Sequence, residues 1–341
     1  MLKYPVPIKP IGGAVIGAVV SVVIVGVSLV SAIAIPFSTY ALTLACFGIT
    51  HVLVELRYVD SRFSGRLGAT LVDRLLVLVL AIALIRLGSV GGLLPPHWGV
   101  ALELLCGLGL VAIATLVLGQ QHWRWGTWGL GVGSLLALGI YVDPIVTSVG
   151  LAIIHNLTPI GFILERQPSR RILLLCLLIF VVLPLFILVW QWLNPVSFSW
   201  ADNTTYLAAF VPPLWQNIAI AYPLFSAVTF LQCMHYAAVI GLFSQWTEEH
   251  PKVASEIEQR IVSKTVFPWG STRAVYGYLI VIAIVFWIAF QQSFGLTRAL
   301  YGTIAAVHAW IEIPLLLLLA PIWQPTNQQP HAVGSEIRPK R

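Results

Sequence analysis

Four of the eight histidines lie inside long apolar stretches of the sequence, where an ionisable side chain is costly and indicates a functional site. Each stands in a different stretch: His51, His155, His235 and His308. The other four fall near predicted helix ends, in loops or in the tail, and are expected to be solvated: His97, His122, His250 and His331. Imidazole nitrogens suit iron, copper or zinc better than magnesium or calcium, which prefer oxygen. We predict that the four histidines in the apolar stretches bind one metal ion together.

Two glutamates stand one helical turn after two of these histidines. Glu55 follows His51, and Glu312 follows His308, both at a spacing of four residues, so each pair lies on one helix face. A carboxylate at that distance can accept the free ring N–H of a metal-binding histidine and fix its orientation. It can also bind metal directly, which would favour a pair of metal ions. For Glu55 an interfacial ion pair with Arg57 is the alternative, whereas Glu312 stands well inside an apolar stretch.

Further polar residues and prolines surround the histidines in the sequence. Asn156 and Tyr236 each follow one of the histidines directly and are expected to line the same catalytic cavity. Pro159 and Pro314 each remove a backbone hydrogen bond one turn earlier, and bends of this kind suit a cavity wall. Glu103, alone in another apolar stretch, is a further candidate, with an ordinary hydrogen-bonded role as the alternative.

The composition indicates what surrounds these residues. Of the 341 residues, 58% are apolar and 9% are charged, whereas a soluble domain carries about a quarter charged residues. This excludes a soluble enzyme with an ordinary surface. It also excludes a soluble nucleic-acid-binding protein, because the basic residues form no contiguous face despite a pI near 9.3. The four cysteines stand in apolar runs and are expected to act as small buried hydrophobic residues.

The apolar stretches predict an all-α, polytopic bundle of about ten transmembrane helices. A bilayer core of roughly 30 Å needs about 20 apolar residues of helix. The predicted spans are 11–34, 37–56, 69–88, 97–118, 125–142, 145–164, 171–193, 223–245, 274–293 and 299–320. The first span is longer than the apolar part of a signal peptide, so we expect it to be retained. A bacterial inner or internal membrane is the expected location.

The basic residues predict the orientation of the bundle. Lys and Arg resist translocation, so the loops that carry them are expected inside, with both termini cytoplasmic. The outside loops then hold one basic residue, Arg298. We predict one domain, 1–324, with an interfacial cytoplasmic helix at 251–264 and an outer re-entrant or interfacial segment at 198–222. A disordered cytoplasmic tail follows at 325–341. The four histidine-bearing helices all run inward, so the histidines can share one layer slightly on the cytoplasmic side of the midplane.

One histidine on each of four membrane helices resembles the membrane-embedded Brp/Blh carotene-cleaving oxygenases, which are thought to hold a non-haem iron with four histidines. The resemblance covers this pattern alone. It is carried by His51 in Thr-His-Val-Leu-Val-Glu, His155 in Ile-His-Asn-Leu-Thr-Pro, His235 in Cys-Met-His-Tyr and His308 in Val-His-Ala-Trp-Ile-Glu. It implies iron, most simply one Fe(II) per chain, whereas the imidazole ligands alone would also suit zinc or copper, and the two His-x-x-x-Glu pairs would suit a dimetal site. It also implies an oxygenase or oxidase that joins O₂ to a carotenoid, another isoprenoid or a lipid.

Two other functions are compatible with the same residues. A proton- or ion-coupled transporter would use the His and Glu side chains as a relay and needs no bound metal. A non-catalytic membrane scaffold or assembly factor would use the histidines only to hold neighbouring helices together. The sequence contains no HExxH, phosphate-binding loop, serine elbow or CxxC motif. The expected partners are a lipophilic small molecule, O₂ and membrane lipids, and the sequence indicates no nucleic acid and no particular protein partner.

Overall fold

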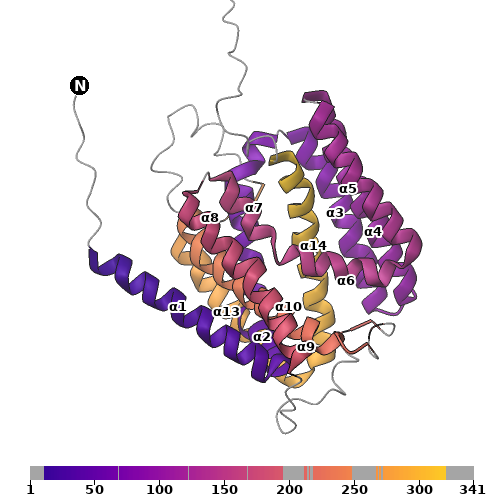
Figure 1. Ribbon diagram of the computed structural model, residues 1–341. Coiled ribbons are helices and arrows are strands. Elements are labelled where there is room, and N and C mark those ends of the chain that lie inside the picture. The colour runs from indigo at the N-terminus through magenta and orange to yellow at the C-terminus, as the bar shows by residue number, and fades with distance from the viewer. Residues whose placement is uncertain are drawn as a thin grey trace, which may run out of the picture.

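The computed structural model describes residues 11–67, 69–121, 123–166, 168–194, 211–212, 215, 218–247, 266–267, 269 and 272–319. Within these residues the chain is a bundle of helices joined by short turns, without a β-strand, which confirms the all-α class (Figure 1). The predicted helix 251–264 and the tail 325–341 lie outside the described residues. So does most of the predicted outer segment 198–222.

The helices follow the predicted spans closely. They are α1 (Ile11–Ala34), α2 (Pro36–Leu67), α3 (Ala69–Val90), α4 (Pro96–Gln121), α5 (Trp123–Val142), α6 (Pro144–His155), α7 (Thr158–Glu165), α8 (Arg170–Leu177), α9 (Leu183–Leu193), α10 (Ala221–Ala238), α13 (Thr272–Gln292) and α14 (Phe294–Leu319). Two π-helical turns interrupt this order. Leu178–Val182 joins α8 to α9, and Val239–Phe243 continues α10.

Seven helical segments among the described residues are long and apolar enough to cross a membrane. An eighth crossing results if α6 and α7, which are bent by 41° relative to each other, count as one broken span. The chain is therefore a multi-pass membrane protein by length and composition. In α3 the three charged residues Asp73, Arg74 and Arg86 lower the apolar character, and α1 counts only as a shorter apolar helix from Val19. The count of ten spans and the side of each terminus stay predictions.

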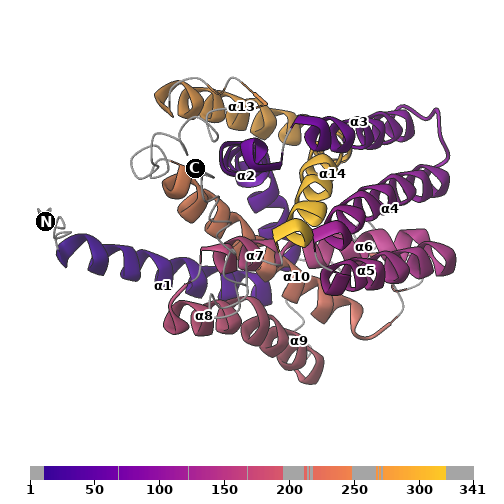
Figure 2. The ribbon, with the colours of Figure 1, turned by 90° about the horizontal axis from the view of Figure 1, so that it is seen from above.

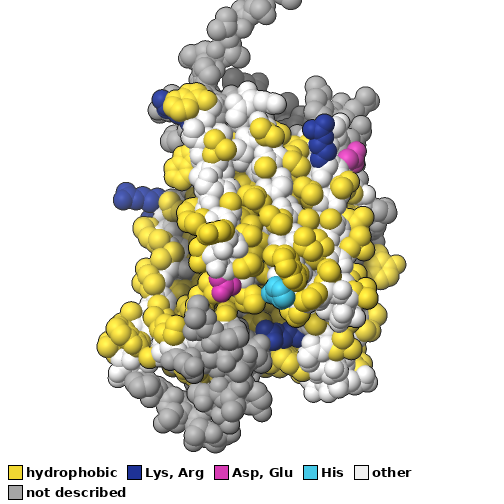
Figure 3. Space-filling model, turned by 90° about the vertical axis from the view of Figure 1, so that its right-hand side faces the viewer, with side chains coloured by type: hydrophobic (Ala, Val, Ile, Leu, Met, Phe, Trp, Pro, Cys, Tyr) yellow, Lys and Arg dark blue, Asp and Glu magenta, His cyan; other side chains and the backbone are white. Residues whose placement is uncertain are grey.

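Three helices form the inside of the bundle. Seen from above, α14 lies at the centre next to α2 and α10, with α3, α4, α5 and α6 on one side and α1, α8, α9 and α13 on the other (Figure 2). The outer helices expose mostly apolar side chains, and one face of the molecule is hydrophobic over most of its area (Figure 3). This surface suits contact with lipid chains. The polar chemistry is therefore confined to the interior.

An aromatic cluster holds α7 against the central helices. Tyr58 and Phe63 of α2 pack with Phe162 of α7 and with Phe243 of the π-helical turn after α10, and all four are buried. Leu315 of α14 belongs to the same cluster. Because four helices meet here, the end of α6 that precedes α7 is fixed relative to α2, α10 and α14. That end carries one of the four histidines.

Candidate metal centre

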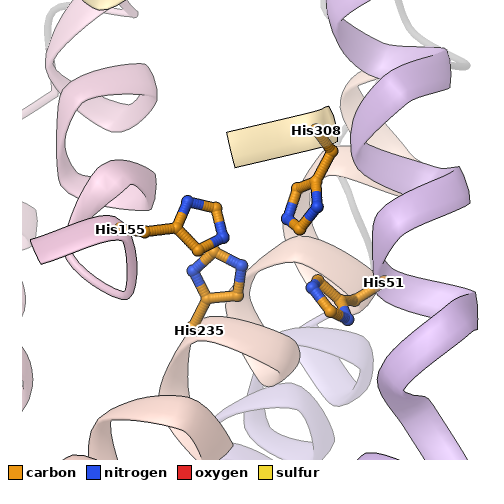
Figure 4. Close-up of side chains that lie close together, drawn as sticks. All are labelled: His51, His155, His235 and His308. Carbon is orange, nitrogen blue, oxygen red and sulfur yellow. The ribbon is translucent and has the colours of Figure 1, made fainter. Parts of the chain in front are cut away.

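The four histidines predicted to act together converge in the middle of the bundle. One ring nitrogen from each of His51, His155, His235 and His308 lies within 4.8 Å of the others. The rings point toward one another from α2, from the end of α6, from α10 and from α14 (Figure 4). Neighbouring ring centroids are 4.6–5.2 Å apart. The structure thus brings the four together, and their role as ligands stays a prediction.

The His51 ring is held in place from two sides. Its Nδ1 lies 3.4 Å from the carbonyl oxygen of Phe47, one turn earlier in α2. Tyr236 of α10 stacks on the ring, with centroids 4.0 Å apart and planes at 24°. A backbone partner at Nδ1 favours the tautomer in which Nε2 has its lone pair free for a metal.

A break in the chain positions His155. α6 ends at this residue, and α7 begins at Thr158 with Pro159 in its first turn. Pro159 has no N–H, so the His155 carbonyl loses its helical partner. The hydroxyl of Thr158 replaces that partner by donating to the carbonyl at 2.8 Å. The bend expected at Pro159 is therefore present, whereas Pro314 lies within a continuous α14.

The other two histidines lie in the interior of long helices. His235 stands near the end of α10, one turn before the π-helical turn Val239–Phe243, and such turns often occur at functional sites. His308 lies in the middle of α14. Both are 1% exposed, so neither has water as a ready partner.

The two predicted glutamates reach the histidines of other helices. Glu312 Oε2 lies 3.1 Å from His155 Nδ1, and Glu55 Oε2 lies 3.4 Å from His235 Nε2. The Nε2 of His308 is 3.9 Å from Glu55 and 4.0 Å from Glu312. Glu55 is fully buried at this position, so the interfacial ion pair considered for it from the sequence does not describe its place in the fold.

These side chains are buried without hydrogen-bond partners among the described residues. The atoms concerned are both ring nitrogens of His155, His235 and His308 and both carboxylate oxygens of Glu55 and Glu312. Buried polar atoms in proteins nearly always form hydrogen bonds, so ten such atoms without one, four of them in His–Glu contacts of 3.1 and 3.4 Å, call for an explanation. A cation among them would supply it. The buried group of four histidines and two glutamates can hold a metal ion.

A cavity of about 270 Å³ extends from the histidines toward the end of the bundle where α14 begins. Asn156 and Tyr236 line it, and their catalytic role stays a prediction. Asn156 Nδ2 also donates to the carbonyl of Ala152 at 2.9 Å, so part of its amide serves the end of α6. Most of the other lining side chains are apolar.

Tyr301 is a cavity residue that the sequence reasoning missed. Its hydroxyl lies 3.1 Å from that of Tyr236, and both side chains are buried. Tyr301 stands seven residues before His308, which is two helical turns on the same face of α14. That spacing was the signal that could have found it.

Glu103 has a different role from the two glutamates at the centre. Its carboxylate forms an ion pair with Arg86 of α3 and accepts a hydrogen bond from the indole N–H of Trp310 at 3.0 Å. The hydrogen-bonded alternative considered from the sequence is therefore the one observed. Glu103 belongs to a separate polar cluster that joins α3, α4 and α14.

Comparisons of the chain with family models, with curated proteins and with solved structures found no match. The resemblance to the carotene-cleaving oxygenases therefore rests on the four-histidine pattern alone. It stays a prediction, and the functional argument depends on the geometry of the centre.

Proposed function

We propose that this protein is a membrane-embedded, metal-dependent oxygenase or oxidase that uses non-haem iron and O₂ on a lipophilic substrate. The convergence of four histidines from four helices, next to an apolar cavity, is the observation that carries the proposal. A carotenoid, another isoprenoid or a lipid is the substrate class implied by the four-histidine resemblance. The metal identity and the reaction are part of the proposal.

Charge balance supports one divalent ion at the centre. Four neutral imidazoles leave the two positive charges of such an ion uncompensated. Glu55 and Glu312, both buried within 4.0 Å of histidine nitrogens, supply two negative charges if both are ionised. The ion and the two carboxylates then form a neutral group, which reduces the cost of burying charge in the bundle.

The chain's own residues would divide the remaining tasks. Iron, when bound, supplies the activation of O₂. Glu55 and Glu312 orient His235 and His155 by accepting from ring nitrogens, and this fixes the nitrogens that face the metal. The apolar cavity walls hold the substrate and keep bulk water from the reacting atoms.

Iron loading and oxygen uptake test the proposal. Purified protein would be loaded with Fe(II) or with Zn(II) without air, and then mixed with oxygenated buffer and β-carotene, another isoprenoid or a polyunsaturated lipid. We expect oxygen consumption and an oxidised product from the iron-loaded protein alone. The proposal is wrong if the protein binds neither iron, zinc nor copper, or if iron-loaded protein consumes no oxygen with any lipophilic substrate.

A transporter is the second candidate, and the break between α6 and α7 favours it. Discontinuous helices with ionisable residues at the break form ion sites in many transporters, and His155 lies at this break beside Glu312. Proteoliposomes with a pH-sensitive dye inside distinguish the two functions. Proton or cation flux that persists in metal-free protein would support transport and count against the oxygenase.

A further inference from the structure

We infer that the cavity binds an elongated amphiphile whose anionic head contacts Arg298 and whose apolar chain extends down to the four histidines. This inference rests on the proposed function, because it names the class of the substrate. It concerns the end of the cavity remote from the metal centre. The binding it describes is measurable whether or not the protein turns the ligand over.

The cavity is a shaft parallel to α14. Arg298, Tyr301, Ala305 and His308 all line it, at spacings of three and four residues that put them on one face of the helix. The ten residues from Arg298 to His308 correspond to about 15 Å at 1.5 Å per residue. On α10, Ala221 and His235 also line the shaft, and their separation in the helix corresponds to about 21 Å. A chain that entered at Arg298 would therefore have to be long to reach the histidines.

The middle of the shaft suits a hydrocarbon chain. Leu44, Val228 and Ala305 contribute apolar walls. The polar groups at this depth are engaged with protein partners: the hydroxyls of Tyr236 and Tyr301 bond each other, and the Gln232 amide donates to the Thr43 hydroxyl at 3.0 Å. A chain without polar atoms thus loses no hydrogen bond by lying there.

The far end of the shaft carries a positive charge. Arg298 is half-buried where α14 begins, with Pro212 and Trp215 also lining that end. In the predicted topology Arg298 is the one basic residue of the outside loops, where Lys and Arg are disfavoured. Its place on a cavity wall therefore favours a role in binding a ligand. A guanidinium has five N–H donors in a planar fork that matches a carboxylate or phosphate. It can therefore bind an anionic head with two donors and keep its contacts with the protein through the others.

Saturable binding of tritiated hexadecanoate to the full-length protein in detergent tests this arrangement. Hexadecanol and hexadecyl phosphate would serve as competitors, and the variants would be Arg298→Gln and Arg273→Gln. Arg273 is exposed on α13 and does not line the shaft, so its variant controls for the loss of one charge. Stronger competition by the phosphate than by unlabelled hexadecanoate would identify a phosphate head, and the reverse a carboxylate head.

We expect the native protein and Arg273→Gln to prefer hexadecanoate over hexadecanol by about tenfold to a hundredfold, the size of a charge-assisted hydrogen bond. Arg298→Gln should remove that preference. Ala305→Phe, which fills the shaft between its two ends, should weaken binding of both probes. Equal binding of acid and alcohol by the native protein, or an unchanged preference in Arg298→Gln, would overturn the inference.

The same measurement on His235→Ala separates this inference from the proposed function. We expect that variant to keep the preference for the acid over the alcohol, because Arg298 lies at the other end of the shaft, although its affinity for both probes can change because His235 lines the shaft. Binding that survives in a protein shown to hold no metal would sustain the amphiphile site while the oxygenase fails. Iron-dependent oxygen uptake by a protein that binds acid and alcohol equally would support the oxygenase and contradict the amphiphile site.

Discussion

Two of the clusters of ionisable side chains inside the bundle differ in how their polar atoms are satisfied. In the Arg86–Glu103–Trp310 cluster, Glu103 Oε1 accepts from Arg86 at 2.9 Å and from Trp310 at 3.0 Å. In the histidine centre, both carboxylate oxygens of Glu55 and of Glu312 have no hydrogen-bond partner among the described residues. In the first cluster Arg86 Nε has no hydrogen bond, but it lies against Glu103 as part of the ion pair. The second leaves the carboxylate oxygens without hydrogen bonds, in a group of side chains that can hold a metal ion.

The two clusters share α14, which explains why they occur together. Trp310 stands between His308 and Glu312 in the sequence, and position 310 lies roughly 200° around the helix from 308. Its indole therefore faces α4 while the two site residues face the centre. The paired cluster fixes the rotation of α14 about its axis, and that rotation aims His308 at the other three histidines.

The largest effect expected is loss of bound metal from the centre. His235→Ala removes one of four converging nitrogens from a buried site, so we expect iron to be absent from the purified variant. His97→Ala is the matched control, because His97 is exposed at the start of α4. Elemental mass spectrometry of both proteins measures the difference. Equal iron in the two variants would show that the histidine centre is not the metal site.

Breaking the paired cluster should cost stability and leave the metal in place. Arg86→Gln leaves Glu103 buried without its cation, and loss of one partner of a buried pair costs about 3–5 kcal/mol. We expect the lower end, because the Arg86 side chain is 31% exposed and Glu103 can take up a proton. Unfolding in mixed detergent micelles, followed by tryptophan fluorescence, measures the cost.

A double variant sharpens this prediction. Replacing both Arg86 and Glu103 by Leu removes the two charges together, which by itself is often close to neutral for stability. The Trp310 N–H then loses its acceptor, so we expect a remaining loss of about 1 kcal/mol. The folded fraction of each variant should still bind metal as the native protein does. A variant that folds normally but loses its metal would show that the two clusters are not separate.

How much of the fold and of the centre could be predicted from the sequence depends on whether the interacting residues lie on the same helix or on different helices. The histidines and glutamates of the centre were identifiable because an ionisable residue in an apolar helix is conspicuous by itself. The environment of Glu103 was not, because its partners Arg86 and Trp310 lie on two other helices. Which helices pack together, and with what rotation, is decided by tertiary contacts that a periodic pattern does not specify.

The partners of Glu55 and Glu312 were also not predictable from the sequence. A spacing of four residues predicted that Glu55 and Glu312 would lie near the histidines, and they do. Their shortest contacts are nevertheless with His235 and His155 on other helices, not with the histidines of their own helices. The spacing identified the residues, and only the packing of α2 against α10, and of α14 against α6 and α7, identified the partners.

A smaller effect is expected when one carboxylate of the centre is neutralised. Glu312→Gln keeps the size of the side chain but removes its charge beside His155. If Glu312 orients that histidine, metal affinity should fall by about 10–100-fold. Competition with a chelator of known affinity measures it. Glu103→Gln is the control from the paired cluster, and it should lose stability without a change in affinity.

The size of the loss also distinguishes a carboxylate that supports a ligand from one that is a ligand. Complete loss of one of two metal ions per chain in Glu312→Gln would place Glu312 in direct contact with metal and support the dimetal alternative. An affinity equal to that of the native protein would contradict both roles.

The smallest effect concerns the tyrosine pair on the cavity wall beside the centre. Tyr301→Phe removes one hydroxyl of the buried Tyr236–Tyr301 contact and leaves the other without that partner, so stability should fall by about 1 kcal/mol. Metal content should not change, because the ring of Tyr236 still stacks on His51. Tyr278→Phe, at an exposed position of α13, is the control and should have no measurable effect on unfolding. Loss of metal in Tyr301→Phe would mean that the Tyr236–Tyr301 contact, and not the stacking alone, holds His51 in place. Tyr301 would then count as a residue that positions the metal centre.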